Sequence, residues 1–163
     1  MSLIAVDSAA ASGRVFTLHP GDVALGDRGD RLETLLGSCV AIVLTDPRRT
    51  VGVMCHIVHT RSGAGPGAGN AAFADVARSS MHGLLLRRAI PPSLCEAWVF
   101  GGGNMFPDVF SQTHVGDDNA RWALDSLGAD GIRVLGYDLG GTSYRRLSWT
   151  VGSGEPQVVA IPV

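Results

Sequence analysis

One cysteine of this sequence stands where it could act as a nucleophile. Cys39 follows Gly37 and Ser38 and opens the apolar segment CVAIVLTD, residues 39–46. A thiol needs a neighbouring base or a lowered pKa before it becomes a useful nucleophile. Without such a partner, Cys39 would be a small core residue, as most buried cysteines are. The question is therefore whether the fold brings a base to Cys39.

Two apolar segments around Cys39 predict a β-hairpin. Residues 39–46 and 51–59 are rich in Val and Ile and have the length of buried strands. Between them, Asp46 and Pro47 occupy the first two positions of a favourable type I turn.

The register of that hairpin selects one histidine out of five. A turn centred after Pro47 pairs Leu44 with Val51 and Cys39 with His56. Directly opposed residues hold their Cβ atoms about 4.5–5.5 Å apart, so this register predicts a Cys39–His56 pair. A loop of a different length would shift the register by one and remove the pairing.

A zinc site is a second interpretation of the same region. Cys55, His56 and His59 are potential ligands, but side chains three residues apart on a strand diverge, and no second cysteine pair follows. The zinc interpretation is therefore weaker than the nucleophile interpretation, and the sequence indicates neither a metal nor a cofactor.

Composition limits the class of protein. The chain has 163 residues and a net charge of −2, and it lacks the basic stripe of a nucleic-acid surface. No apolar run is long enough for a membrane span or a signal peptide. An odd count of three cysteines argues against a disulfide framework and for a reducing cytoplasm. We expect a flexible leader over residues 1–13 and one domain over residues 14–163.

The remaining patterns predict the elements that position Cys39. Helical spacing indicates an amphipathic helix over about residues 71–89, capped by Asn70, and a second helix that ends at Gly128. Further strands are expected in residues 14–25, 96–100, 132–138, 143–151 and 156–163. The order of these elements predicts an α/β domain with a mixed β-sheet and two main helices.

Four motifs occur in a specific order along the chain. They are LLGSCVAIVLTDPRRTVGVMCHIVH, VFGGGNMF, VGDDN and GYDLGGTSYRR. In this order they resemble the chemoreceptor glutamine deamidases of the CheD family, from about Val15 to Val159.

The resemblance implies a fold and an activity. It implies an α/β sandwich related to deamidase toxins of the cytotoxic necrotizing factor type. It also implies that Cys39 and His56 convert glutamines of methyl-accepting chemotaxis receptors to glutamates, sometimes with methylesterase activity. A CheC-type phosphatase is an implied partner, and a non-catalytic interaction module that binds this phosphatase or the receptors is the alternative.

Two positions depart from the pattern of the family. Six residues before the cysteine, where a catalytic threonine is common, this sequence has Glu33, and Thr34 follows one residue later. An offset of one residue reverses the direction of a strand side chain, so Thr34 is a third catalytic candidate only if a bulge turns it. Asp118 replaces the arginine of the family's Gly-x-Arg-Asn motif.

The proposed chemistry also needs donors for an oxyanion. Candidates are the backbone around Gly37, Ser38 and Cys39, together with Gly102 in the loop 101–106. Asn104 in the same loop could bind the substrate amide, although a turn is the simpler role for an asparagine there. We expect this loop and residues 61–70 to form the walls of the site.

Overall fold

The computed structural model describes residues 13–60, 70–109, 114–152 and 154–162. The predicted leader, apart from Gly13, and most of the predicted wall over residues 61–70 lie outside these ranges. The described helices are α2 (Ala74–Arg87), α3 (Val115–Ala129) and the short 3₁₀ helix η1 (Pro92–Leu94). The strands are β1 (Val15–Leu18), β2 (Val23–Asp27), β3 (Arg31–Leu36), β4 (Val40–Thr45), β5 (Val51–Cys55), β6 (Glu96–Gly101), β7 (Arg133–Leu139), β8 (Tyr144–Thr150) and β9 (Gln157–Ile161).

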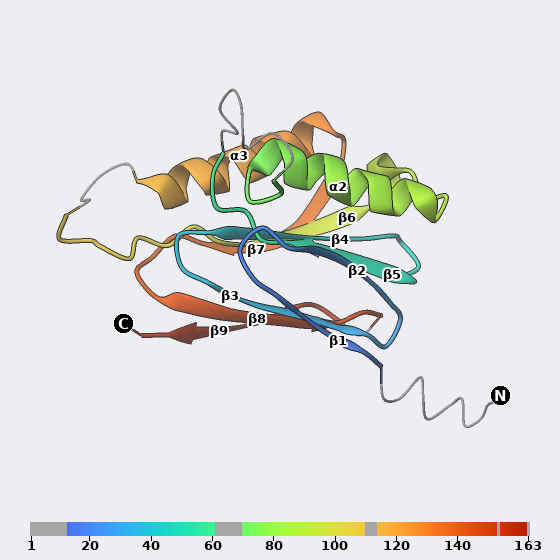
Figure 1. Ribbon diagram of the computed structural model, residues 1–163, viewed down its shortest axis with the longest axis horizontal. Coiled ribbons are helices and arrows are strands. Elements are labelled where there is room, and N and C mark those ends of the chain that lie inside the picture. The colour runs from blue at the N-terminus through green and yellow to red at the C-terminus, as the bar shows by residue number, and fades with distance from the viewer. Residues whose placement is uncertain (1–12, 61–69, 110–113, 153, 163) are drawn as a thin grey trace.

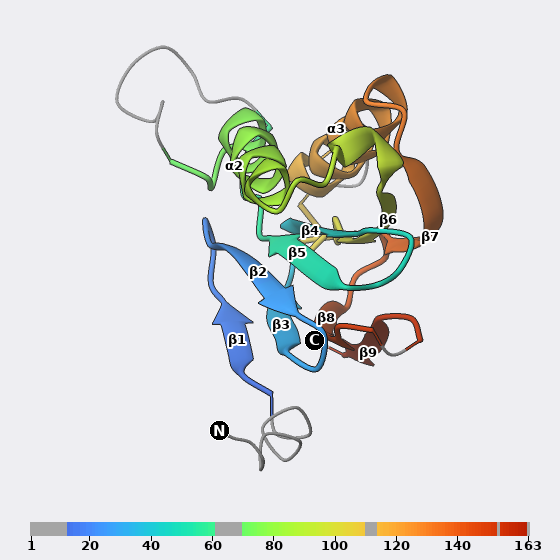
Figure 2. The same ribbon diagram turned by 90° about the vertical axis from the view of Figure 1, so that its right-hand side faces the viewer.

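The elements form three layers, with both long helices on one side, as Figure 1 shows. Beneath the helices lies a five-stranded sheet in the order β2-β5-β4-β6-β7. A four-stranded sheet, β1-β3-β8-β9, packs against its other face. Each sheet is mixed, because β6 pairs with β7 and β1 with β3 in parallel while the other pairings are antiparallel. The side view in Figure 2 shows α2 and α3 side by side above β4, β5 and β6.

Strand β4 is the centre of the molecule. All six of its residues are buried, and so are all five of β5. One hydrophobic core lies between the helices and the five-stranded sheet, and includes Ile42 and Leu44. A second core lies between the two sheets, and includes Ala41 and Val43. A strand buried on both faces is apolar wherever its side chains have no hydrogen-bond partner, which explains the apolar run that follows Cys39; Thr45 at its end donates to the Val51 carbonyl.

The predicted class, a mixed α/β fold with two main helices, is confirmed, but the strands belong to two sheets rather than one. Strand β3 shows why, because its burial alternates and only Leu32, Thr34 and Leu36 face the interior. A strand that is apolar on one face covers one side of a core. The second sheet therefore covers the apolar face of β4 that the helices do not cover.

The predicted register of the hairpin is wrong by two residues. Leu44 pairs with Val53 rather than with Val51. The predicted turn is present, since the N–H of Arg49 donates to the carbonyl of Asp46 at 2.9 Å. However, Arg49 has a left-handed φ of 57°, and the Asp46 carboxylate accepts the N–H of Val51 at 3.0 Å. The loop is thus longer than the turn alone, and its length sets the register.

Both predicted helices are present, with different ends. The carboxamide of Asn70 accepts the N–H of Ala72 at 2.9 Å in a turn that precedes α2, so it does not cap the helix. Helix α3 continues through Gly128, and Gly131 takes the left-handed conformation after it, with φ of 72°. None of the described helices is long and apolar enough to cross a bilayer.

Candidate active site

Cys39 lies in the short connection between β3 and β4, and its backbone is held by the segment that follows β6. The N–H of Gly102 donates to the Cys39 carbonyl at 2.9 Å, and the N–H of Gly103 donates to the Gly37 carbonyl at 3.0 Å. Gly101 has φ of 113°, and a Cβ there would lie 2.1 Å from the Cys39 carbonyl oxygen. Only glycine permits this approach, so the GGG segment is built to clamp the half-buried cysteine.

His56 follows β5, and its side chain faces the space between the two sheets. Its carbonyl accepts the N–H of Gly21 at 2.9 Å, and its N–H donates to the Asp22 carbonyl at 3.2 Å. The residue is 3% exposed. A buried imidazole needs polar partners, and the structure supplies one from the opposite sheet.

That partner is Thr34 of β3, whose Oγ1 lies 2.8 Å from Nδ1 of His56. The same hydroxyl donates to the carbonyl of Leu18 at 2.7 Å. A hydroxyl has one proton, so Thr34 accepts from the imidazole and Nδ1 carries the hydrogen. In the neutral ring, Nε2 is then the unprotonated nitrogen.

The expectation that Thr34 points away from the site without a bulge is wrong. The pairings of β3 run without interruption on both sides, and Thr34 lies in phase with the buried residues Leu32 and Leu36. Glu33 faces outward, where it accepts from Thr17 Oγ1 at 3.1 Å. Thr34 therefore lies beside His56 although it stands five residues, not six, before Cys39.

The shift in register keeps Cys39 and His56 on one face. The bridge between Val40 and Ile57 places Ala41 opposite His56, and Cys39 lies two residues before Ala41. Since side chains alternate along a strand, an even shift preserves the face, and Cys39 packs against the core between the sheets. The two residues become diagonal neighbours rather than a directly opposed pair. Within the described residues no hydrogen bond joins the thiol to the imidazole.

Burial favours the neutral forms of both groups. It lowers the pKa of His56 to about 4, although the charge of Asp22 opposes the shift, and the charge of His19 adds to it. Burial also raises the pKa of the Cys39 thiol above its ordinary value, and its own backbone N–H opposes this shift. At neutral pH, Cys39 is therefore a thiol beside an uncharged imidazole.

The loop residues predicted to assist the reaction have structural roles. The N–H of Gly102 is used by the Cys39 carbonyl, so it is not free to bind an oxyanion. The carboxamide of Asn104 accepts the N–H of Phe106 at 3.0 Å, which is the turn role. No carbonyl accepts the N–H of Cys39 within the described part of the chain, so the backbone at Ser38 and Cys39 remains a candidate for the predicted oxyanion donors.

One residue at the site was missed by the sequence reasoning. Asn119 of α3 is 1% exposed, and its Nδ2 donates to the carbonyls of Ser38 and Val58, both at 3.1 Å. The available signal was its place on the apolar stripe of α3 with Ala123 and Leu127. An amide at such a position must find partners in the interior.

The zinc interpretation does not compete with this site. Cys55 packs in the core beneath the helices, on the face opposite to His56, and His59 contacts the ring of Phe73 with centroids 5.3 Å apart.

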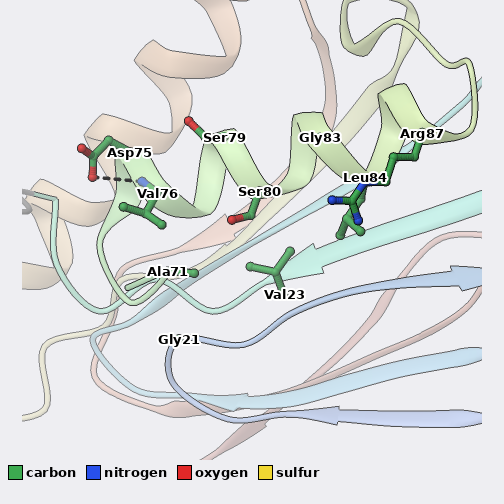
Figure 3. Close-up of a pocket in the computed structure, with 10 residues that line it drawn as sticks. All are labelled: Gly21, Val23, Ala71, Asp75, Val76, Ser79, Ser80, Gly83, Leu84 and Arg87. Carbon is green, nitrogen blue, oxygen red and sulfur yellow. Dashed lines mark hydrogen bonds between the residues drawn. The ribbon is translucent and has the colours of Figure 1, made fainter. Parts of the chain in front are cut away.

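A groove of about 700 Å³ lies between α2 and the start of β2 (Figure 3). Its lining contains neither a cysteine nor a histidine, so it offers no cysteine–histidine pair.

Comparison with known proteins gives a family and several relatives. Residues 59–159 match the family model CheD, described as CheD chemotactic sensory transduction. A protein of Albidiferax ferrireducens named "Probable chemoreceptor glutamine deamidase CheD 2" is 36% identical over 142 residues, which is 85% of this chain and 82% of that protein. A relative from Jannaschia sp., named a probable chemoreceptor glutamine deamidase CheD, is 32% identical over 149 residues and covers 90% of this chain and 82% of its own.

Two solved structures are similar at lower levels. Bacillus licheniformis hypothetical protein YfiH has a TM-score of 0.46 at 15% identity, over 76% of this chain and 58% of that one. A Neisseria meningitidis protein of the family DUF152 has a TM-score of 0.45 at 12% identity, over 85% and 68%. Neither is a toxin of the cytotoxic necrotizing factor type, so that predicted relation stays a prediction. The matched family segment begins after His56 and assigns no role to Thr34, Cys39 or His56.

Proposed function

The chain belongs to the CheD family, and we propose that it is a chemoreceptor glutamine deamidase with Cys39 as nucleophile and His56 as general base. The reaction converts the side-chain amide of a receptor glutamine to a carboxylate and releases ammonia. The observation that carries the proposal is the 2.8 Å contact between Thr34 Oγ1 and His56 Nδ1. It leaves Nε2 as the unprotonated nitrogen of a histidine that lies on the same face as Cys39, which supports its proposed role as the base.

The first half of the reaction is thiol attack. Nε2 of His56 takes the proton of Cys39 as Sγ bonds to the carboxamide carbon, because the thiol is protonated at rest. The carbonyl oxygen becomes an oxyanion that needs hydrogen-bond donors. The N–H of Cys39, which no carbonyl of the described chain accepts, is the nearest donor to the new bond.

The second half returns the enzyme to its starting state. The imidazolium of His56 gives its proton to the amide nitrogen, and the carbon–nitrogen bond breaks to release ammonia. The acyl group stays on Cys39 as a thioester. His56 then takes a proton from water as the water oxygen attacks the thioester carbon. The thiolate of Cys39 leaves and recovers that proton, and the product is glutamate. The added negative charge alters the receptor electrostatically.

Thr34 is the third member of the proposed site. It holds the imidazole by accepting from Nδ1, and its hydrogen bond strengthens when the ring becomes charged. The Glu33 departure was the reason to consider a non-catalytic interaction module. Because Thr34 takes the place next to His56, that reason disappears and the enzyme is the better proposal.

The proposed partners and compartment follow from the substrate and the cysteines. The substrate is the cytoplasmic domain of a methyl-accepting chemotaxis receptor, and a CheC-type phosphatase is a further proposed partner. All three cysteines are free thiols, a state that a reducing cytoplasm maintains.

The test is a deamidation assay on purified receptor cytoplasmic domain, with mass spectrometry of its glutamine-containing peptides. We expect the wild-type chain to convert glutamine to glutamate, and Cys39→Ser and His56→Gln to reduce the rate by at least about 100-fold. Cys95→Ser and His59→Gln are the matched controls and should retain activity. Absence of conversion by the wild type, or full conversion by Cys39→Ser, would overturn the proposal.

A further inference from the structure

Strands β4 and β5 separate at the nucleophile. Their last ladder bonds join Val40 and Ile57, with N–H to carbonyl distances of 3.0 and 2.8 Å. The next ladder bonds would join Ser38 and His59, but the N–H of His59 donates to the carbonyl of Ala72 at 3.1 Å, and the carbonyl of His59 accepts the N–H of Ala74 at 2.8 Å. The strand ladder therefore does not fix the spacing between the residues that flank Cys39 and His56.

The side chain of Asn119 spans this gap. Its single NH₂ group donates to the carbonyl of Ser38 and to the carbonyl of Val58, at 3.1 Å each. Ser38 directly precedes the nucleophile, and Val58 lies two residues after the base. We propose that Asn119 is a positioning residue, which keeps Cys39 at its working distance from His56. The inference rests on the deamidase function proposed above.

The two acceptors fix the orientation of the amide. Only the NH₂ end can bond two carbonyls, since the opposite orientation would place Oδ1 against two oxygens. Oδ1 itself is buried and has no partner within the described residues. An unpaired buried acceptor destabilises a fold, so the amide is present for its two donor bonds and not for its packing.

Helix α3 reaches the site through a close contact between backbones. A Cβ on Gly116 would lie 2.5 Å from the Gly102 carbonyl oxygen, and a Cβ on Gly102 would lie 2.8 Å from the Gly116 carbonyl oxygen. The first turn of α3 therefore rests directly on the segment that clamps Cys39. This contact brings Asn119, in the next turn, within reach of both carbonyls.

The apolar stripe of α3 supplies the matched controls. Asn119, Ala123 and Leu127 lie on one buried face. Leucine at position 119 branches at the same atom as asparagine and has as many side-chain heavy atoms, although it is larger, and it removes both donors together with the unpaired acceptor. Aspartate has the same shape and turns a carboxylate toward two carbonyls. Leu127→Ala weakens the same helix without touching Ser38 or Val58.

The experiment combines two measurements on the full chain. The first is the steady-state rate of deamidation of receptor cytoplasmic domain, and the second is the rate at which iodoacetamide alkylates Cys39, followed by peptide mass spectrometry. For Asn119→Leu we expect kcat to fall about 10- to 100-fold with KM within about 2-fold, since small misplacements of reacting groups cost that much. Asn119→Asp should fall further. Alkylation of Cys39 should become several-fold faster, because the freed connection exposes the half-buried thiol.

Leu127→Ala, which serves as the reference for lost stability, should change neither rate while the protein is folded. If Asn119→Leu matches Leu127→Ala in both measurements, the positioning role is wrong. If alkylation accelerates in Asn119→Leu but the wild type converts no glutamine, the deamidase function fails and the positioning of Cys39 stands.

Discussion

Replacement of Thr34 by valine tests the central contact of the proposed site. Valine keeps the shape of threonine and loses the hydroxyl, which lies 2.8 Å from Nδ1 of His56 and 2.7 Å from the Leu18 carbonyl. Two buried polar groups thus lose their partner while the packing between the sheets is kept.

The effect on catalysis can be worked from the Nδ1 bond. In the transition state His56 becomes a cation, and hydrogen bonds to charged groups contribute about 1.5–3 kcal/mol. At about 1.4 kcal/mol for each factor of ten, Thr34→Val should lower kcat by about 10- to 150-fold. Loss of the Leu18 bond should also lower the free energy of unfolding by about 1–3 kcal/mol.

Thr45→Val separates the two effects. Thr45 is fully buried, and its hydroxyl donates to the Val51 carbonyl at 2.7 Å, at the far end of β4 from Cys39. We expect a similar loss of stability, measured by urea unfolding, with kcat for receptor deamidation unchanged. If Thr34→Val keeps kcat within about 2-fold of wild type while folded, or if both variants lose kcat equally, the role of Thr34 is refuted.

Three further predictions concern pH, an exposed residue and the glycine clamp. The pKa of His56 falls from 6.5 to about 4 on folding, so between pH 6.5 and pH 4 the unfolded chain binds more protons than the folded chain. Stability should decrease by up to about 3 kcal/mol as pH falls from 6.5 to 4, and His56→Gln should remove this part of the decrease in pH-dependent urea unfolding. Glu33→Ala should keep kcat within about 2-fold in the deamidation assay, because Glu33 faces outward; a large loss would contradict the inward assignment of Thr34. Gly101→Ala should reduce deamidation by at least about 10-fold. The new Cβ would lie 2.1 Å from the Cys39 carbonyl oxygen, at a φ of 113° that alanine rarely adopts, so the backbone of Cys39 must move. Wild-type activity would show that the clamp is dispensable.

The sequence was sufficient where a local pattern carries the information. The unbroken apolar runs predicted β4 and β5 as buried strands, and helical spacing predicted α2 and α3. The common face of Cys39 and His56 also followed from the sequence, because alternation along strands survives a register error of two residues. Only the length of the loop after Asp46, which depends on the left-handed Arg49, was beyond the turn rules.

Contacts between distant elements could not be predicted in the same way. Thr34 meets His56 across the two sheets, 22 residues away in sequence, and a rule based on offset along one strand cannot detect this. Asn119 meets Ser38 at a separation of 81 residues. Its place on the buried stripe of α3 indicates an interior position, but only the packing of α3 on Gly102 brings its amide to the site.

The raised pKa of Cys39 has a consequence for the lifetime of the protein. Oxidants such as peroxides attack the thiolate rather than the thiol. A nucleophile that stays protonated until a carboxamide is in place is therefore shielded from sulfenic and sulfinic acid formation between turnovers. The same burial that holds the proton on the thiol therefore also slows the oxidation of Cys39.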